Sequence, residues 1–183
     1  MLKKARGFTL IELLIVVAII GILAALLIPN AITAIQKAKQ KSTMKDIMTL
    51  ATGSADFITD QGAWLTANPP VASPGPLTVG CAYALALTPF YVKIIPTNDQ
   101  WGTPYEVYLG AAVGTQRGIL PTSVGNDDFL IQSLGRDQDP DDFSYNEQDP
   151  SAGMYTISEM EHFNYDLVNW SGSWIRCPRT AIQ

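Results

Sequence analysis

The chain has 183 residues, enough for one long helix and one modest domain, and its formal net charge at pH 7 is −5. The charge is uneven, because residues 1–48 carry seven basic and two acidic side chains whereas residues 49–183 carry five basic and fifteen acidic ones. Such an acidic C-terminal part argues against nucleic-acid binding, which depends on attraction between basic side chains and phosphates.

The N-terminus combines a short basic leader, residues 1–7, with an apolar segment of membrane length. As a helix, residues 8–28 would extend about 31 Å, which matches the thickness of a bilayer core. The polar side chains of this segment are Thr9 and Glu12. An ionised carboxylate in lipid is costly, so Glu12 is a candidate functional residue. The basic leader predicts a cytoplasmic N-terminus and a C-terminal part that crosses the membrane.

The hexapeptide Gly7-Phe8-Thr9-Leu10-Ile11-Glu12 resembles the class III signal of type IV pilins and of the pseudopilins of type II secretion. The resemblance implies that a prepilin peptidase cleaves between Gly7 and Phe8 and methylates the new N-terminus. An ordinary secretory signal is not indicated, because its small residues would follow the apolar run and not lie before it. The alternative is an uncleaved signal anchor.

Glu12 is predicted to act in filament assembly. Cleavage would leave an ammonium group on Phe8 among apolar side chains, and Glu12 lies one helical turn further along. Its carboxylate would neutralise that ammonium within the chain or on a neighbouring subunit, and pairing between subunits would fix the stagger of the packed helices. The alternative is a tolerated polar residue near the membrane surface.

One long helix is predicted from about Thr9 to Thr59, kinked or loosened at Pro29 because proline removes a hydrogen bond. Its first half, residues 8–28, is the expected transmembrane segment and filament core. In residues 29–60 apolar side chains recur every three or four positions, with lysines mostly opposite. We therefore expect this amphipathic half to pack on a globular domain, residues 61–183.

The rest of the chain predicts a small domain. The proline-rich stretch 68–76 is expected to be a surface loop. A short helix is expected at 81–87, and strands at 105–109, 128–133 and 155–157. The fold class is therefore α+β, with the long N-terminal helix laid on a small antiparallel sheet, as in type IV pilins.

Three motifs, in the same order, resemble the major pseudopilin of type II secretion. They are the D-x-W-G-x-P-Y segment at 99–105, the S-L-G-x-D turn at 133–137 and the D-I-x-N-W segment at 166–170, which reads Asp-Leu-Val-Asn-Trp here. A type IV pilin would share the N-terminal motif without needing these three. The same residues also have a structural interpretation, as a packed hairpin corner and as an aromatic side chain that covers the end of the sheet.

The resemblance also implies a calcium ion in the loop between the second and third motifs. Carried over, Asp137 and Asp166 would supply carboxylates and Leu134 a main-chain carbonyl. The acidic neighbour of Asp166 in the family is Tyr165 here, so one ligand of the family pattern is missing.

The acidic loop, residues 135–166, offers replacements for that ligand, with Asp139 and Asp141 as candidates. Calcium takes six to eight oxygen ligands in flexible geometry, which clustered aspartates and carbonyls can supply. The calcium ion would have a structural role, because it would hold in place a loop whose carboxylates repel one another. The alternative is a solvated acidic loop without a metal.

Cys81 and Cys177 are the two cysteines of the chain. In an oxidising periplasm they are candidates for a disulfide that closes a loop of about 96 residues and tethers the C-terminal tail. The alternative is two buried thiols.

A catalytic function is not expected. The single histidine, His162, lies in a polar stretch, and the sequence contains no nucleophile, zinc or phosphate-binding motif to accompany it.

Together these features predict a structural subunit of a type II secretion pseudopilus, which polymerises through its N-terminal helix and helps to export folded proteins across the outer membrane. It would be a single-pass protein of the bacterial inner membrane with a periplasmic domain, assembled into a periplasmic filament. The expected partners are further copies of the chain, the prepilin peptidase, minor pseudopilins, and an inner-membrane assembly platform with its ATPase. The alternatives are a type IV pilin for adhesion or motility and a membrane-anchored calcium-binding module that never polymerises.

Overall fold

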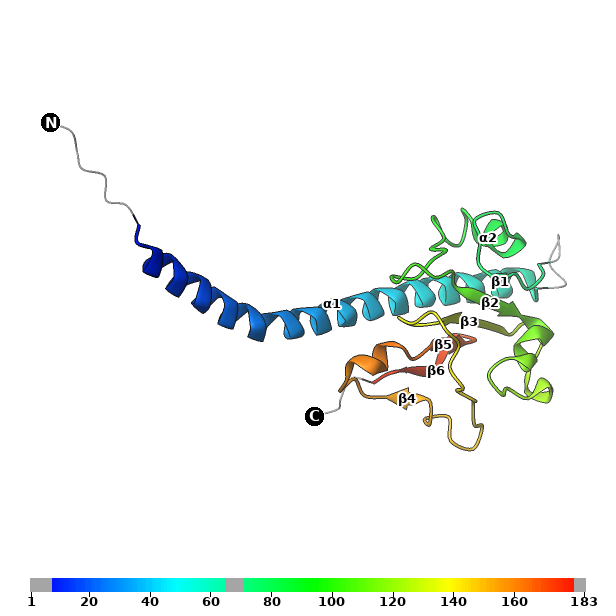
Figure 1. Ribbon diagram of the computed structural model, residues 1–183. Helices are drawn as coiled ribbons and strands as arrows, with labels where there is room; N and C mark the ends of the chain where they lie inside the picture. Colours follow the sequence, from blue (N-terminus) through cyan, green and yellow to red (C-terminus); the bar gives the residue numbers. More distant parts are fainter. Residues whose placement is uncertain (1–7, 65–70, 180–183) are drawn as a thin grey trace. The chain divides into compact units, whose positions relative to one another are not determined.

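The computed structural model describes residues 8–64 and 71–179. The elements in these ranges are two α-helices, three short 3-10 helices and six strands (Figure 1). The chain divides into two compact units, one ending at Ala38 and the other beginning at Lys39. The predicted leader, residues 1–7, lies outside the described residues.

Helix α1 extends over Leu10–Gln61 and confirms the predicted long helix to within two residues at each end. It continues through Pro29 without a break in its helical assignment. Proline lacks the N–H of a helical residue, and the hydroxyl of Thr33, four residues later, donates to the Pro29 carbonyl at 3.1 Å.

The first part of α1 exposes its large apolar side chains. Leu10 is 82% exposed, Ile22 65% and Leu26 68%. By length and composition α1 is able to cross a membrane. A helix that is apolar on all sides is stable when lipid or other helices surround it, so this segment requires such an environment.

The second unit contains one mixed sheet, with the strand order β1-β2-β3-β5-β6-β4. All its neighbouring strands are antiparallel apart from the parallel pair β4 and β6. The strands are β1 Gly75–Pro76, β2 Glu106–Leu109, β3 Phe129–Ser133, β4 Met154–Tyr155, β5 Leu167–Trp170 and β6 Ser173–Pro178. The short helices are α2 Ala82–Leu87, η1 Gly110–Thr115, η2 Pro121–Ser123 and η3 Met160–Phe163.

The α+β class predicted from the sequence is confirmed. Strands β2 and β3 match the predicted strands at 105–109 and 128–133, and α2 matches the predicted helix at 81–87. Of the expected loop at 68–76, residues 68–70 lie outside the described residues, and its end is wrong, because Gly75 and Pro76 form β1. Pro76 is tolerated there because β1 is an edge strand, which does not need every backbone donor.

Both faces of the sheet are covered. On one face, Ile47 and Leu50 of α1 are fully buried in a core that contains Phe129 and Ile131 of β3. On the other face, Leu130 belongs to a second apolar cluster with Val113, Ile119, Val168 and Ile175. All five residues of β3 are therefore buried, and Gln132 lies on the same side of that strand as Leu130, away from α1.

The predicted disulfide between Cys81 and Cys177 is not formed in the structure, in which both residues are free thiols. Cys81 caps α2 by accepting a hydrogen bond from Ala84 N at 3.4 Å. Cys177 is buried, with its sulfur 3.3 Å from the sulfur of Met154.

The two thiols lie beside different parts of α1. Tyr83, close to Cys81, hydrogen-bonds to Ser54 of α1, whereas Tyr155, next to the Met154 that contacts Cys177, hydrogen-bonds to Gln40. Ser54 and Gln40 are separated by about 21 Å of helix at 1.5 Å per residue. The neighbours of the two cysteines therefore contact different turns of α1.

Candidate functional site

Glu12 caps the N-terminus of α1. Its carboxylate accepts hydrogen bonds from Thr9 N at 2.8 Å and from the Thr9 hydroxyl at 2.7 Å, while Glu12 N donates to the same hydroxyl at 3.3 Å. This reciprocal arrangement is a capping box, which satisfies donors that the first helical turn leaves free. Phe8 precedes it and is 85% exposed, whereas Gly7 lies outside the described residues. Cleavage at Gly7, methylation of Phe8 and the assembly role of Glu12 therefore stay predictions.

The three C-terminal motifs meet in space. Asp99 of the first motif accepts hydrogen bonds from Trp101 N and Thr103 N, at 2.9 and 3.0 Å, which closes the turn predicted there. Its other oxygen accepts from the Ser133 hydroxyl of the second motif at 2.7 Å. Ser133 in turn pairs with Leu167 of the third motif across β3 and β5. The motifs therefore form one continuous corner of the sheet, which was not predicted from the sequence.

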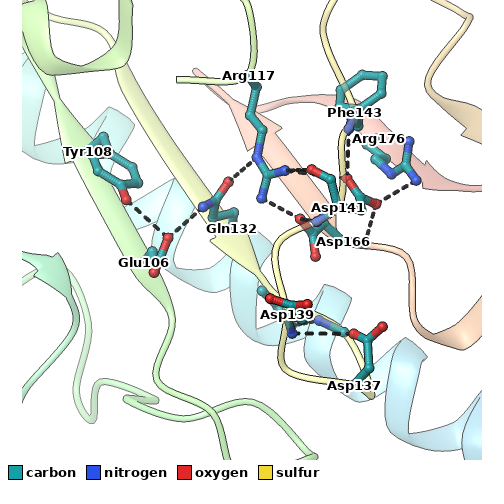
Figure 2. A network of polar contacts seen from close by, with 12 residues as sticks. Glu106, Tyr108, Arg117, Gln132, Asp137, Asp139, Asp141, Phe143, Asp166 and Arg176 are labelled. Carbon is teal, nitrogen blue, oxygen red and sulfur yellow. Dashed lines mark hydrogen bonds and ion pairs between the residues drawn. The ribbon is translucent and has the colours of Figure 1, made fainter. Parts of the chain in front are cut away.

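Beyond this corner, on the face away from α1, lies a group of buried charges that we call the arginine cluster: Arg117, Asp141, Asp166 and Arg176 (Figure 2). Arg117 follows η1, Asp141 lies in the acidic loop, Asp166 precedes β5, and Arg176 belongs to β6. Side-chain exposure is 7% for Arg117, 0% for Asp166, 20% for Asp141 and 15% for Arg176.

The guanidinium of Arg117 connects three parts of the domain. Its Nε donates to Gln132 Oε1 of β3 at 2.8 Å, and its Nη2 donates to Asp166 Oδ2. Its Nη1 donates to the carbonyl and to Oδ1 of Asp141, at 2.8 and 3.3 Å. The backbone of Arg117 has φ +50°, a conformation uncommon for a residue other than glycine. Several directed contacts therefore hold this residue in a costly backbone conformation.

Arg176 completes the cluster from β6. Its Nη2 contacts Asp141 Oδ2 at 2.5 Å. The guanidinium lies over the rings of Phe143 and Tyr165, 4.7 Å from each ring centroid. Arginine is well suited to such a place, because it forms ion pairs at its edge and stacks on aromatic faces.

The environment of Asp166 favours its neutral form, and Arg117 opposes this. Burial raises the pKa of the Asp166 carboxyl to about 7, the Arg117 guanidinium acts to lower that pKa, and the charge of Asp141 acts to raise it. A buried carboxylate is stable when an opposite charge and hydrogen bonds compensate its lost hydration. Arg117 therefore supplies the compensation that Asp166 needs.

The residues predicted to bind calcium are only partly brought together. Asp141 and Asp166 lie side by side, but guanidinium groups contact both of them. Asp137 and Asp139 are exposed, and their mutual contact is a hydrogen bond from Asp139 N to Asp137 Oδ1 at 3.4 Å, apart from the arginine cluster in Figure 2. Leu134, the predicted carbonyl ligand, is buried.

In the described part of the chain, no three acidic, histidine or cysteine side chains gather as a metal site would require. The arrangement of these residues thus does not fit the calcium site that the motifs implied, and calcium binding stays a prediction. His162, for which no catalytic role was expected, accepts a hydrogen bond from Ser158 N at 3.1 Å and caps η3.

Sequence reasoning missed Arg117, Arg176 and Gln132. For the two arginines the available signal was charge. In an acidic domain with five basic residues, each basic side chain is a candidate partner for carboxylates. Nothing in the local pattern indicates the pairing, since 24 residues separate Arg117 from Asp141 and 49 separate it from Asp166.

Comparison with known proteins gives a consistent result. Residues 2–28 match the family described as the prokaryotic N-terminal methylation motif. The chain is 32% identical to type II secretion system core protein G of Pseudomonas aeruginosa over 147 residues, which cover 76% of this chain and 94% of that protein. It is 28% identical to core protein G of Aeromonas hydrophila over 148 residues, which cover 76% of this chain and 90% of that protein.

A shorter similarity points to surface pili. The type IV major pilin protein PilA of Myxococcus xanthus is 50% identical over 58 residues, which cover 32% of this chain and 26% of that pilin. No solved structure matches the chain. The similarity to the secretion proteins thus extends over much more of both partners than the similarity to the pilin.

Proposed function

Because the chain belongs to the family of type II secretion system core protein G, we propose that it is a structural subunit of the pseudopilus of such a system. The observation that carries this proposal is the extent of the similarity, which covers 94% of the Pseudomonas protein and is therefore not confined to the N-terminal methylation motif. The methylation motif at 2–28 supports the same assignment.

The exposed apolar part of α1 supports assembly through this helix. Residues such as Leu10, Ile22 and Leu26 are more than half exposed, so they need lipid in the stored subunit and neighbouring helices in a filament. Both environments are apolar, and the segment can pass from one to the other without exposing its side chains to water. Membrane storage and filament packing thus place the same demand on this sequence.

Glu12 is the residue that would set the stagger of the subunits. After cleavage at Gly7, Phe8 would carry a charged amine beside the capping box of Thr9 and Glu12. A carboxylate in an apolar bundle is stable when a cation compensates it, so only a stagger that pairs Glu12 with a Phe8 ammonium would be favoured.

The location and partners follow from the same features. The basic leader favours a cytoplasmic N-terminus, and hence an inner-membrane anchor with a periplasmic domain. Processing would need a prepilin peptidase, and polymerisation would need an assembly platform, its ATPase and minor pseudopilins. The chain itself would contribute packing and register, not catalysis.

The test is the variant Glu12→Gln, produced at native level in the host bacterium. Glutamine keeps an oxygen that accepts from Thr9, so the helix cap is retained while the charge is removed. We expect the variant to accumulate in the membrane in normal amount but to form no filaments. The matched control, Glu161→Gln, removes an exposed charge in η3 and should assemble normally.

Three results would contradict the proposal. Normal filaments in Glu12→Gln would show that the buried charge does not set the register. Filaments that extend from the cell surface at native expression would favour a type IV pilin, the function that the similarity to PilA supports. A wild-type chain that never forms filaments would favour the anchored module.

A further inference from the structure

We propose that the guanidinium of Arg117 takes the place of a metal ion in this chain, so that the acidic loop is fixed without calcium. The proposal concerns the folded domain and holds whether or not the chain assembles into a filament. It starts from the disagreement between the calcium site implied by the motifs and the contacts of Asp141 and Asp166 in Figure 2.

Arg117 lies where the implied cation would act. A cation between the second and third motifs would join the acidic loop to the start of β5, and Arg117 makes that connection directly. It contacts Asp141 in the loop and Asp166 before β5, and it adds Gln132 of β3 as a third anchor. A guanidinium has five N–H donors in a fixed plane, which allows it to hold several oxygens at defined angles.

The charges around Arg117 disfavour a second cation. The arginine cluster contains two carboxylates and two guanidinium groups, so its formal charges cancel. A divalent cation bound to Asp166 would lie beside the positive charge of Arg117 in a site that is almost completely buried. Repulsion between like charges is strong where water is excluded, so calcium and Arg117 would compete for the same carboxylates.

Direct hydrogen bonds already fix this part of the loop. Asp141 N donates to Asp166 Oδ2 at 3.1 Å, and Asp166 N donates to Asp141 Oδ2 at the same distance. Phe143 N donates to Asp141 Oδ1 at 3.1 Å, and Tyr145 N donates to the carbonyl of Arg117 at 2.6 Å. These contacts attach residues 141–145 to the rest of the domain, which is the task assigned to the metal.

The competing possibility is that calcium binds to the one unpaired oxygen of this cluster. Asp166 Oδ1 is buried and has no hydrogen-bond partner among the described residues. A calcium ion at this oxygen would need further ligands. Asp137 is the carboxylate that the family pattern implies for this purpose. The effect of calcium on the wild-type chain and on Asp137→Asn therefore separates the two possibilities.

The experiment measures the melting temperature of the full-length chain in detergent micelles by tryptophan fluorescence, in EGTA and in millimolar calcium. All four tryptophans, Trp64, Trp101, Trp170 and Trp174, belong to the second unit, so the signal reports on the domain. The samples are the wild type, Arg117→Gln and Asp137→Asn. Unassembled subunits are used so that a failure here leaves the pseudopilus proposal untouched.

We expect the wild type to melt at the same temperature in EGTA and in calcium, and Asp137→Asn to behave like the wild type. Arg117→Gln leaves the buried Asp166 carboxylate without its cation and should melt roughly 10 °C lower or fail to fold. A melting temperature of the wild type that rises with calcium, with the rise lost in Asp137→Asn, would overturn the proposal and confirm the calcium prediction. A normal melting temperature of Arg117→Gln in EGTA would also overturn it.

Discussion

At the scale of single residues, Gly135 shows why the second motif needs its glycine. Its φ is +70°, and an added Cβ would lie 2.4 Å from the carbonyl oxygen of Asn164 and 2.9 Å from that of Tyr165. Both obstacles are backbone atoms next to Asp166, so they cannot turn away as a side chain would. Gly135 therefore lets the second and third motifs approach each other.

The variant Gly135→Ala should lower the free energy of unfolding by about 3 kcal/mol, from left-handed strain and the backbone clash together. Gly172→Ala is the matched control, because Gly172 has φ +86° but nothing within 4 Å of an added Cβ. The control should cost about 1 kcal/mol, the strain alone. Urea unfolding followed by tryptophan fluorescence gives both values, and equal losses would contradict the close approach.

The two cysteines give a second prediction at this scale. Burial raises the pKa of the Cys177 thiol to about 11, so little reactive thiolate is present at neutral pH, whereas Cys81 is only partly buried. In the native chain, isolated without reductant, we expect an alkylating reagent to modify Cys81 much faster than Cys177, with both modified after unfolding. A chain with no titratable thiols after unfolding would show that the disulfide forms.

At the scale of elements, the fold depends on the second half of α1 packing on one face of the sheet. Three- and four-residue spacing in residues 29–60 predicted this, because apolar periodicity is a property of the local sequence. Strands β2 and β3 were also predictable from alternation and flanking turns. Strands β5 and β6 were not, because polar residues such as Asn169 and Arg176 take part in contacts that depend on the complete fold.

The packing of α1 is tested by Leu50→Ala. Leu50 is fully buried in the core, so its truncation should lower the free energy of unfolding by about 2–5 kcal/mol. The same substitution at Leu85 of α2, which is 64% exposed, should change it by less than about 0.5 kcal/mol. Similar small losses at both positions would contradict the packing of this part of α1 on the sheet.

At the scale of the whole molecule, the sequence predicted the function better than the chemistry of the acidic loop. The N-terminal signal and the three motifs are contiguous in sequence, so their resemblance to secretion pseudopilins could be recognised directly. The partner of Asp166 could not, because Arg117 belongs to a different segment and is placed by η1, β3 and β5 together.

A structural subunit of a secretion pseudopilus should be required for secretion by its system. The decisive experiment is deletion of the chain in its host, with the proteins that the type II system secretes measured in the medium and in the periplasm. We predict that these proteins accumulate in the periplasm and that the wild-type chain, but not Glu12→Gln, restores their release. Unchanged secretion, together with a loss of surface filaments, would contradict the account and identify the chain as a pilin.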